Sequence, residues 1–297
     1  MQKNLKKYAK LVLRIGISST LIIWLIWKQD FTRIVDYIRE YNPLYFLVAI
    51  ILMILGTYMS ATRWRIILLT SRKDVPTKNL FILYVKGYFY NNFLPTQMGG
   101  DVYKSVALGK QINDQSIALF SVFMDRFGGL LILLTMSLFG IASLNGIEGV
   151  LVGSILFVIG LLLYFPILKI FSKKIKFLQK FLEASEMLVA HKKYALLIIL
   201  FSFLVQVFSF AMVYVLFMGF GINLPFIAVI AYMPLGALSL LIPSFNGFGT
   251  QELVYSSLFA TVGVTAELSI AVSVLVHAMR LLMSLFGGVL ILLGKDH

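Results

Sequence analysis

The sequence contains no cysteine, three histidines and few charged residues. Because no thiol is present, disulfides and thiolate metal sites are excluded. The histidines, His191, His277 and His297, are far apart and do not predict a metal centre. Asp, Glu, Lys and Arg make up 13% of the 297 residues, against about 25% in soluble domains. We therefore expect neither a metal nor a cofactor, and the low charge content argues against a soluble protein.

The motifs of common hydrolases and nucleotide-binding enzymes are also missing. The chain has no Gly-x-Ser-x-Gly, no Walker-type glycine-rich loop before Lys-Ser/Thr, and no His-Glu-x-x-His. Asp101, Asp125 and Glu252 have the chemistry of a general acid or base, but the sequence places no activated nucleophile beside them. These absences favour a protein that is not an enzyme.

Long runs of hydrophobic residues are what the sequence does contain. Hydrophobic residues make up 60% of the chain, against about 45–50% in soluble domains. Apolar runs of about 18 residues or more are typical of membrane-spanning helices. We predict an all-α polytopic membrane protein. The apolar blocks cover roughly residues 11–27, 44–62, 79–94, 116–143, 150–168, 194–218, 225–242 and 268–293.

The charge distribution predicts how these blocks lie in the membrane. The chain has 26 Lys and Arg against 13 Asp and Glu, a formal charge of +13, and the basic residues gather in short loops. This pattern indicates membrane topology and contact with anionic lipid rather than nucleic acid. Loops 63–78 and 169–193 are basic and predicted to be cytoplasmic, as are both termini. Loops 144–149 and 219–224 carry no positive charge and are predicted to lie outside, as is loop 28–42 by alternation.

The N-terminal block predicts a retained first span. Its basic start resembles a signal peptide, but no small-residue cleavage site follows, and Trp24 and Trp27 are typical interfacial anchors. The location expected for the protein is the plasma or inner membrane of the cell.

Two of the blocks are predicted not to cross the membrane. An odd number of crossings must separate the cytoplasmic loop 63–78 from the outside loop 144–149, yet two blocks lie between them. The first of these ends in helix breakers at Pro95–Gly100, so we interpret residues 79–115 as a re-entrant hairpin. The same reasoning makes residues 225–262 a hairpin that enters from the opposite side.

These assignments divide the chain into two halves. Residues 1–145 hold two spans, the hairpin 79–115 and the span 116–143, and residues 146–297 hold two spans, the hairpin 225–262 and the span 268–293. We expect an inverted repeat with about six full transmembrane helices and two re-entrant helical hairpins. Two short matches support it: Leu94-Pro95-x-x-x-Gly99 with Ile242-Pro243-x-x-x-Gly247, and Gly128-Gly129 with Gly287-Gly288.

Ionisable residues inside apolar blocks need a partner or a wet cavity, because a charge at the membrane centre costs about 2.5–3.5 kcal/mol. Two interpretations stay open. In the first, acidic and basic side chains pair and only fix helix packing. In the second, they line a polar cavity in which Arg126 and Arg280 hold a lipid phosphate through the guanidinium fork. The residues concerned are Asp101, Lys104, Asp125 and Arg126 in the first half and Gln251, Glu252, His277 and Arg280 in the second.

Three further residues have weaker signals. Arg63 and Arg65 flank Trp64 near the predicted end of a span and are interpreted as interfacial anchors, with a phosphate entrance as the alternative. His277 is interpreted as a hydrogen-bonded residue between helices rather than a proton carrier.

The order of the polar and glycine residues resembles a known family. The motifs are Asn92-x-Leu94-Pro95-x-x-x-Gly99-Gly100-Asp101-x-x-Lys104, Asp125-Arg126, Ile242-Pro243-x-x-x-Gly247-x-Gly249-x-x-Glu252, and Arg280. Over roughly residues 10–293 the chain is similar to the flippase-like family of the lysylphosphatidylglycerol synthase transmembrane region. In the namesake, the multiple peptide resistance factor, this region is taken to move aminoacylated phosphatidylglycerol between leaflets, and a soluble domain makes that lipid. The resemblance implies translocation without the soluble synthase domain.

We therefore predict a lipid translocator that moves a phospholipid such as aminoacylated phosphatidylglycerol, or a polyprenyl-linked glycolipid, between leaflets. An intramembrane transferase acting on a lipid-linked substrate, and an accessory subunit of a lipid-modifying synthase, are the alternatives. The expected partners are membrane lipids with an anionic or lipid-linked headgroup, a second copy of the chain or a lipid-modifying enzyme, and no nucleic acid. The predicted substrate-binding residues are Asn92, Pro95, Gln97, Gly99, Gly100, Asp101, Lys104, Asp125, Arg126, Asn246, Gly247, Gly249, Gln251, Glu252, His277 and Arg280.

Overall fold

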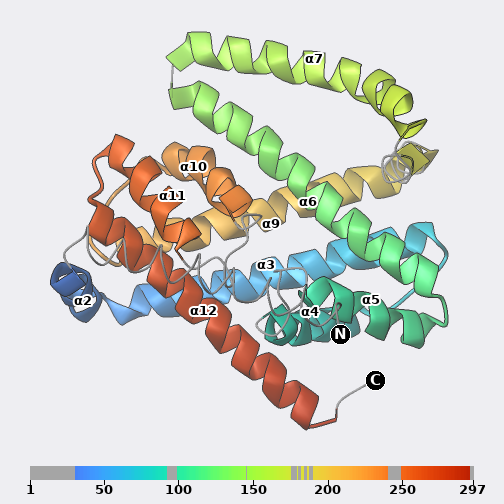
Figure 1. Ribbon diagram of the computed structural model, residues 1–297, viewed down its shortest axis with the longest axis horizontal. Coiled ribbons are helices and arrows are strands. Elements are labelled where there is room, and N and C mark those ends of the chain that lie inside the picture. Colours follow the sequence, from blue (N-terminus) through green and yellow to red (C-terminus); the bar gives the residue numbers. More distant parts are fainter. Residues whose placement is uncertain are drawn as a thin grey trace, which may run out of the picture.

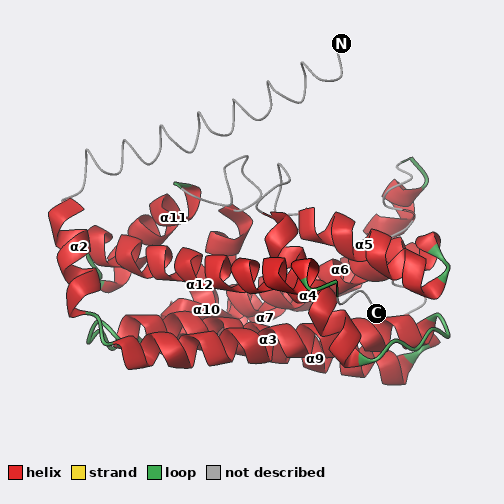
Figure 2. Ribbon diagram, turned by 90° about the horizontal axis from the view of Figure 1, so that it is seen from below, coloured by secondary structure: helices red, strands yellow, loops and turns green. Residues whose placement is uncertain are grey.

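The computed structural model describes residues 31–91, 99–144, 146–174, 190–239 and 249–294, with a few isolated positions between 174 and 190. Every regular element in these ranges is a helix (Figures 1 and 2), which confirms the all-α membrane fold. The elements are α2 (Phe31–Glu40), α3 (Pro43–Thr70), α4 (Thr77–Asn91), α5 (Gly99–Ile112), α6 (Gln115–Leu144), α7 (Gly146–Ser172), α9 (Lys192–Met218), α10 (Phe226–Ser239), α11 (Thr250–Phe259), the 3-10 turn η1 (Ala260–Val262) and α12 (Ala266–Leu292).

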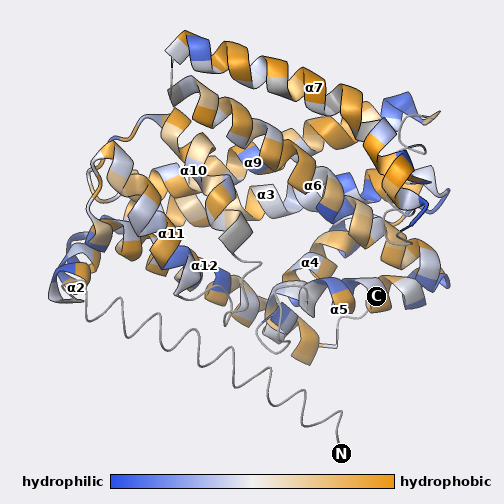
Figure 3. Ribbon diagram, turned by 45° about the horizontal axis from the view of Figure 1, so that its top comes forward, coloured by the Kyte–Doolittle hydropathy of each residue, from blue (hydrophilic) through white to orange (hydrophobic). Residues whose placement is uncertain are grey.

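Within the described ranges, four helices are long and apolar enough to cross a membrane: α3, α6, α9 and α12. Figure 3 shows hydrophobic residues along most of α6, α7 and α9, and hydrophilic residues within α12 and at helix ends. Helix α7 (Gly146–Ser172) is also apolar along most of its sequence, and Pro166 lies inside it. The predicted first span, 11–27, lies outside the described residues. The number of six full spans therefore stays a prediction.

One predicted loop is in fact a helix. Residues 28–42 were expected to form a connecting loop, but α2 occupies Phe31–Glu40. Ile34, Tyr37 and Ile38 follow helical spacing and pack against Ile270 of α12. Charged residues lie between and beside these apolar residues, so the segment contains no long apolar run and was not predicted to be a helix.

Each predicted hairpin has two helical arms that contact each other. Helix α4 ends at Asn91 and α5 begins at Gly99, while α10 ends at Ser239 and α11 begins at Thr250. Helix α4 contacts α5, and α10 contacts α11. The predicted turns, near Pro95 and Pro243, lie outside the described residues. How deeply each hairpin enters the membrane stays a prediction.

The helix ends recur at one interval along the chain. Helix α9 ends 148 residues after α3, at 218 against 70, and α12 ends 148 residues after α6, at 292 against 144. Pro95 and Pro243 of the first motif match share this interval as well. The two Gly-Gly pairs of the second match do not, because they lie 159 residues apart, and so they do not occupy equivalent places.

Helices of the first half pack against helices of the second half. Helices α3 and α9 pack along each other, α4 packs on α12, and α10 packs on α6 (Figure 1). The first arm of each hairpin thus contacts the last helix of the other half. This exchange and the constant interval are what two related halves would produce, although the inverted orientation itself stays a prediction.

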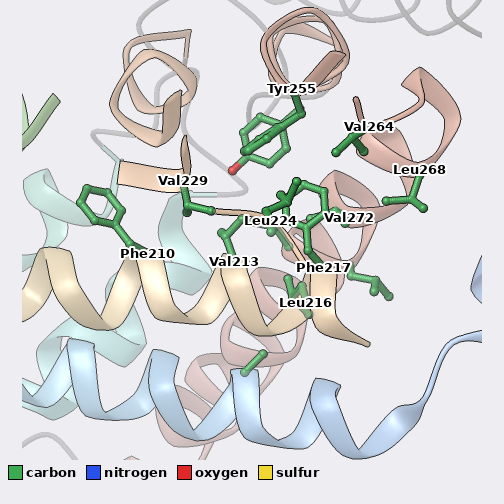
Figure 4. Packing of buried hydrophobic residues seen from close by; sticks show 14 of the residues in the cluster. Phe210, Val213, Leu216, Phe217, Leu224, Val229, Tyr255, Val264, Leu268 and Val272 are labelled. Atoms are coloured by element: carbon green, nitrogen blue, oxygen red, sulfur yellow. The ribbon is translucent and has the colours of Figure 1, made fainter. Parts of the chain in front are cut away.

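The largest core cluster lies where the second hairpin meets α9 and α12. Side chains of these helices and of the loop before α10 interlock there with Tyr255 of α11 (Figure 4). Close packing of this kind holds helices together inside a bilayer, where lipid tails are as apolar as the side chains. The buried members include Phe210, Val213, Leu216, Phe217, Leu224, Val229, Tyr255, Phe259, Val264, Leu268 and Val272.

Two glycines allow the hairpins to approach the last helices closely. A Cβ added to Gly140 of α6 would lie 2.7 Å from the backbone nitrogen of Ala231 on α10. A Cβ added to Gly287 of α12 would overlap the backbone carbonyl of Val85 on α4. Small residues at such crossings are how membrane helices pack backbone to backbone.

Replacing Gly140 or Gly287 with alanine should therefore destabilise the bundle. The added methyl group meets backbone atoms that have no room to rotate away, and overpacking of this kind costs about 1–3 kcal/mol. Thermal unfolding in detergent, followed by circular dichroism, measures the effect. Gly160→Ala on α7 is the matched control, because nothing lies within 4 Å of its added Cβ. Unchanged unfolding temperatures for all three variants would contradict the close helix approach.

Candidate functional site

A buried ion pair joins α3 and α6. Arg63 Nε lies 2.8 Å from Asp125 Oδ1, and the two side chains are 5% and 2% exposed. Arg63 Nη1 also donates to Ser202 Oγ of α9 at 3.1 Å. Pairing and hydrogen bonding are what allow two charges to stay away from water. This contact links three of the long helices at one point.

Aromatic residues of α3 and α4 extend the ion pair toward α5. The Tyr84 hydroxyl donates to the second carboxylate oxygen of Asp125. Lys104 of α5 is 2% exposed, and its ammonium lies 3.9 Å from the ring centre of Tyr84 and 5.3 Å from that of Trp64. A cation over aromatic faces gains electrostatic attraction where water is scarce. Lys104 therefore lies between the rings of Tyr84 and Trp64 and the carboxylate of Asp101.

Asp101, at the first turn of α5, binds two cations. Its Oδ1 lies 2.9 Å from Lys104 Nζ, and its Oδ2 accepts from Arg126 Nε at 2.6 Å. Asp101 is 14% exposed, whereas the side chain of Arg126 is 60% exposed. We call the set Arg63, Tyr84, Asp101, Lys104, Asp125 and Arg126 the first network.

Glu252 is the centre of a second polar cluster, on α11 and α12. Its Oε2 accepts from the backbone N–H of Gly249 at 2.7 Å, which caps the start of α11. Its Oε1 accepts from Ser273 Oγ at 3.1 Å and lies 2.9 Å from His277 Nε2. The capping bond and the contacts to α12 fix the carboxylate on two helices.

Gln251 joins this cluster to Arg280. Its Nε2 donates to Ser273 Oγ at 3.2 Å, and its Oε1 accepts from Arg280 Nη1 at 2.9 Å. Gln251 is 1% exposed and Glu252 is 5% exposed. We call the set Gln251, Glu252, Ser273, His277 and Arg280 the second network.

A cavity of about 210 Å³ lies between α3, α4, α9 and α12, with Arg280 in its wall. Three of its other polar groups come from α3 and α4: Thr57, Ser60 and Tyr88. The hydroxyls of Thr57 and Tyr88 lie 3.3 Å apart, and Ser209 lines the cavity from α9. The cavity therefore combines one guanidinium with several hydroxyl groups.

Helices α3 and α4 connect the cavity with the first network. On α3, Thr57 and Ser60 face the cavity, and Arg63, one turn further along, binds Asp125. On α4, Tyr88 faces the cavity, and Tyr84, one turn earlier, binds the same Asp125. Polar side chains thus run from Arg280 to Arg126 through the middle of the bundle.

Eight of the sixteen predicted site residues lie in one of the two networks. The described residues Asp101, Lys104, Asp125 and Arg126 come together in the first, and Gln251, Glu252, His277 and Arg280 in the second. Gly249 caps α11, and Gly99 and Gly100 begin α5. The other predicted positions, Asn92, Pro95, Gln97, Asn246 and Gly247, lie outside the described residues.

The sequence interpretation missed the partner of Asp125. Arg63 was interpreted mainly as an interfacial anchor like Arg65, but it is a buried member of the first network. Arg65, two residues later, points the other way and donates to both carboxylate oxygens of Asp74 at 2.8 and 3.1 Å. These hydrogen bonds lower the pKa of Asp74, which lies outside the spans. A signal was present, because Gly56 and Ser60 precede Arg63 at helical spacing and mark the inner face of α3.

Comparisons with known proteins point to one family. The family model described as the lysylphosphatidylglycerol synthase TM region matches residues 11–288, as the motifs predicted. The UPF0104 membrane protein PH1989 of Pyrococcus horikoshii is 23% identical over an alignment of 332 residues, covering 98% of each chain. The UPF0104 membrane protein MJ1595 of Methanocaldococcus jannaschii is 27% identical over 135 residues, 45% of this chain and 40% of the relative's length.

No solved structure matches the chain. The family model nevertheless spans all the described helices except the last residues of α12. The match therefore covers both polar networks and the cavity. The chain belongs to the family of the lysylphosphatidylglycerol synthase transmembrane region.

Proposed function

We propose that the protein is a lipid translocator that binds the phosphate of a lipid headgroup at Arg280. The observation that carries the proposal is the setting of this arginine. It lines a cavity in the middle of the bundle, and in the described part of the chain its hydrogen-bond acceptor is the neutral Gln251 rather than a carboxylate. A cation inside a membrane protein that faces a cavity and has no carboxylate in hydrogen-bond contact is suited to binding an anion.

The chemistry of the cavity suits a phosphate. Only Nη1 of Arg280 is used by Gln251, so the other N–H groups of the guanidinium fork can bind phosphate oxygens. The hydroxyls of Thr57 and Ser60 on the opposite wall donate to the backbone carbonyls of Met53 and Gly56 at 2.8 and 3.0 Å, so each would have to rotate away from its own helix to donate to a phosphate. The volume of the cavity is about 210 Å³. That is room for a headgroup phosphate, while the acyl or prenyl tails stay in the lipid.

Movement between leaflets follows from the proposed repeat. If the two halves are inverted, the hairpins α4–α5 and α10–α11 enter from opposite sides, and their rearrangement exposes the cavity to one leaflet and then the other. We also propose the plasma or inner membrane as the location and cytoplasmic termini, from the loop charges. Because the sequence holds no ATP-binding motif, transport would be downhill or coupled to an ion gradient.

Purified protein in liposomes tests the function. We expect a tail-labelled fluorescent phosphatidylglycerol to reach the opposite leaflet faster than in protein-free liposomes, as measured by bleaching from outside with dithionite. A transferase would instead give a new lipid mass when candidate donors are added. An unchanged bleaching curve together with a new lipid product would contradict translocation and favour the transferase.

A further inference from the structure

The first network carries one more positive than negative charge. Arg63, Lys104 and Arg126 bind the two carboxylates Asp101 and Asp125. Arg126 is the member that reaches the surface, because its side chain is 60% exposed and that of Asp101 is 14% exposed. The most accessible positive charge of the network is therefore on Arg126, where α5 and α6 lie together (Figure 1).

The surface around Arg126 is apolar. Leu119 and Leu130 lie seven residues before and four after it on the same face of α6, and they are 54% and 41% exposed. On α5, Val102 follows Asp101 directly and is 56% exposed. Eleven residues separate Arg126 from the start of α6 at Gln115, which is about 16 Å at 1.5 Å per residue. Arg126 thus lies well inside a candidate span, where an exposed cation needs an anionic partner or water.

The geometry of Arg126 leaves its fork available. Asp101 Oδ2 accepts from Nε at 2.6 Å, so this bond does not use the end-on pair of N–H groups formed by Nη1 and Nη2. Asp101 is itself held by the buried Lys104 at 2.9 Å, which fixes the orientation of the guanidinium. Two parallel N–H groups match the two free oxygens of a phosphodiester.

We propose that Arg126 binds the phosphodiester of an anionic phospholipid where α5 and α6 lie together. This lipid site is separate from the cavity at Arg280. It rests on the proposed function in one respect: it would be the place where the translocator takes up its lipid. The occupant is a lipid rather than a soluble phosphate, because Leu119, Leu130 and Val102 offer contacts to acyl chains. Lipid bound there would lie against the polar residues that continue from Asp101 toward the cavity.

Native mass spectrometry of the purified full chain with added phosphatidylglycerol tests this site. We expect Arg126→Gln to weaken lipid binding by about tenfold or more, since charge-assisted hydrogen bonds are lost. Arg126→Lys should give an intermediate affinity, because the ammonium keeps the charge but lacks the fork. Arg65→Gln is the matched control: this exposed arginine also binds an aspartate through Nε, at 2.8 Å, and its loss should leave the affinity unchanged.

Three results would overturn the inference. Equal phosphatidylglycerol binding by wild type and Arg126→Gln would show that the guanidinium is not used. Equal binding of diacylglycerol, which has the tails without the phosphate, would show an apolar contact only. Displacement of the lipid by millimolar inorganic phosphate would show a site for soluble anions. Translocation in liposomes is measured separately, so the lipid site and the proposed function can fail independently.

Discussion

The Asp125→Ala variant is expected to lose about 3–5 kcal/mol of unfolding free energy, because it leaves a buried cation without its carboxylate. Arg63 is 5% exposed and its Nε lies 2.8 Å from Asp125, so water has little access to the charge that remains. Tyr84 loses its acceptor in the same variant. Three helices meet at this carboxylate, and the loss should be seen as a lower unfolding temperature in detergent by circular dichroism.

Asp74→Ala is the control for this prediction. It removes an Arg–Asp pair at the surface, where solvent screens the charges and pairs contribute little. The double variant Arg63→Leu with Asp125→Leu should recover part of the stability, because it leaves no unpaired buried charge. If Asp125→Ala and Asp74→Ala unfold at the same temperature, the buried network does not stabilise the bundle.

The Arg280→Gln variant is expected to slow lipid translocation to the rate of protein-free liposomes. Glutamine keeps polarity and much of the length of the side chain, but it removes the charge and the fork that would bind the phosphate. Each charge-assisted hydrogen bond to the phosphate contributes about 1.5–3 kcal/mol, and losing two of them weakens the affinity for lipid by about a hundredfold or more. Dithionite bleaching of labelled phosphatidylglycerol in proteoliposomes measures the rate.

Folding and charge must be controlled in this experiment. Arg65→Gln makes the same chemical change at an exposed site outside the cavity, so it should translocate at the wild-type rate. The unfolding temperature of Arg280→Gln shows whether the bundle remains intact. A folded Arg280→Gln protein that translocates like wild type would contradict a role for this arginine in lipid binding.

The apolar blocks predicted the long helices well, because the thickness of the bilayer sets how many consecutive apolar residues a spanning helix needs. The predicted block 44–62 became α3 (Pro43–Thr70), which continues past the first charged residues because Arg63 turns inward. Helix α2 was missed, since its stripe of Ile34, Tyr37 and Ile38 covers one face of ten residues and gives no long apolar run.

The polar site could be predicted in part. Charges inside apolar blocks are costly, so their presence alone marked Asp101, Asp125, Glu252 and Arg280. Which residues pair could not be derived, because Asp125 and Arg63 are 62 residues apart and meet only through the packing of α3 on α6. The hydroxyls of the cavity carry no such signal, since serine, threonine and tyrosine are common in membrane helices.

Because the chain contains no cysteine, a single introduced thiol tests directly whether lipid moves through the cavity. Ser209 lines the cavity from α9, while Ser257 is exposed on α11. A bulky thiol reagent attached to Ser209→Cys should block translocation in proteoliposomes, and the same reagent on Ser257→Cys should leave the rate unchanged. Full translocation by the completely labelled Ser209→Cys protein would contradict a route past Arg280.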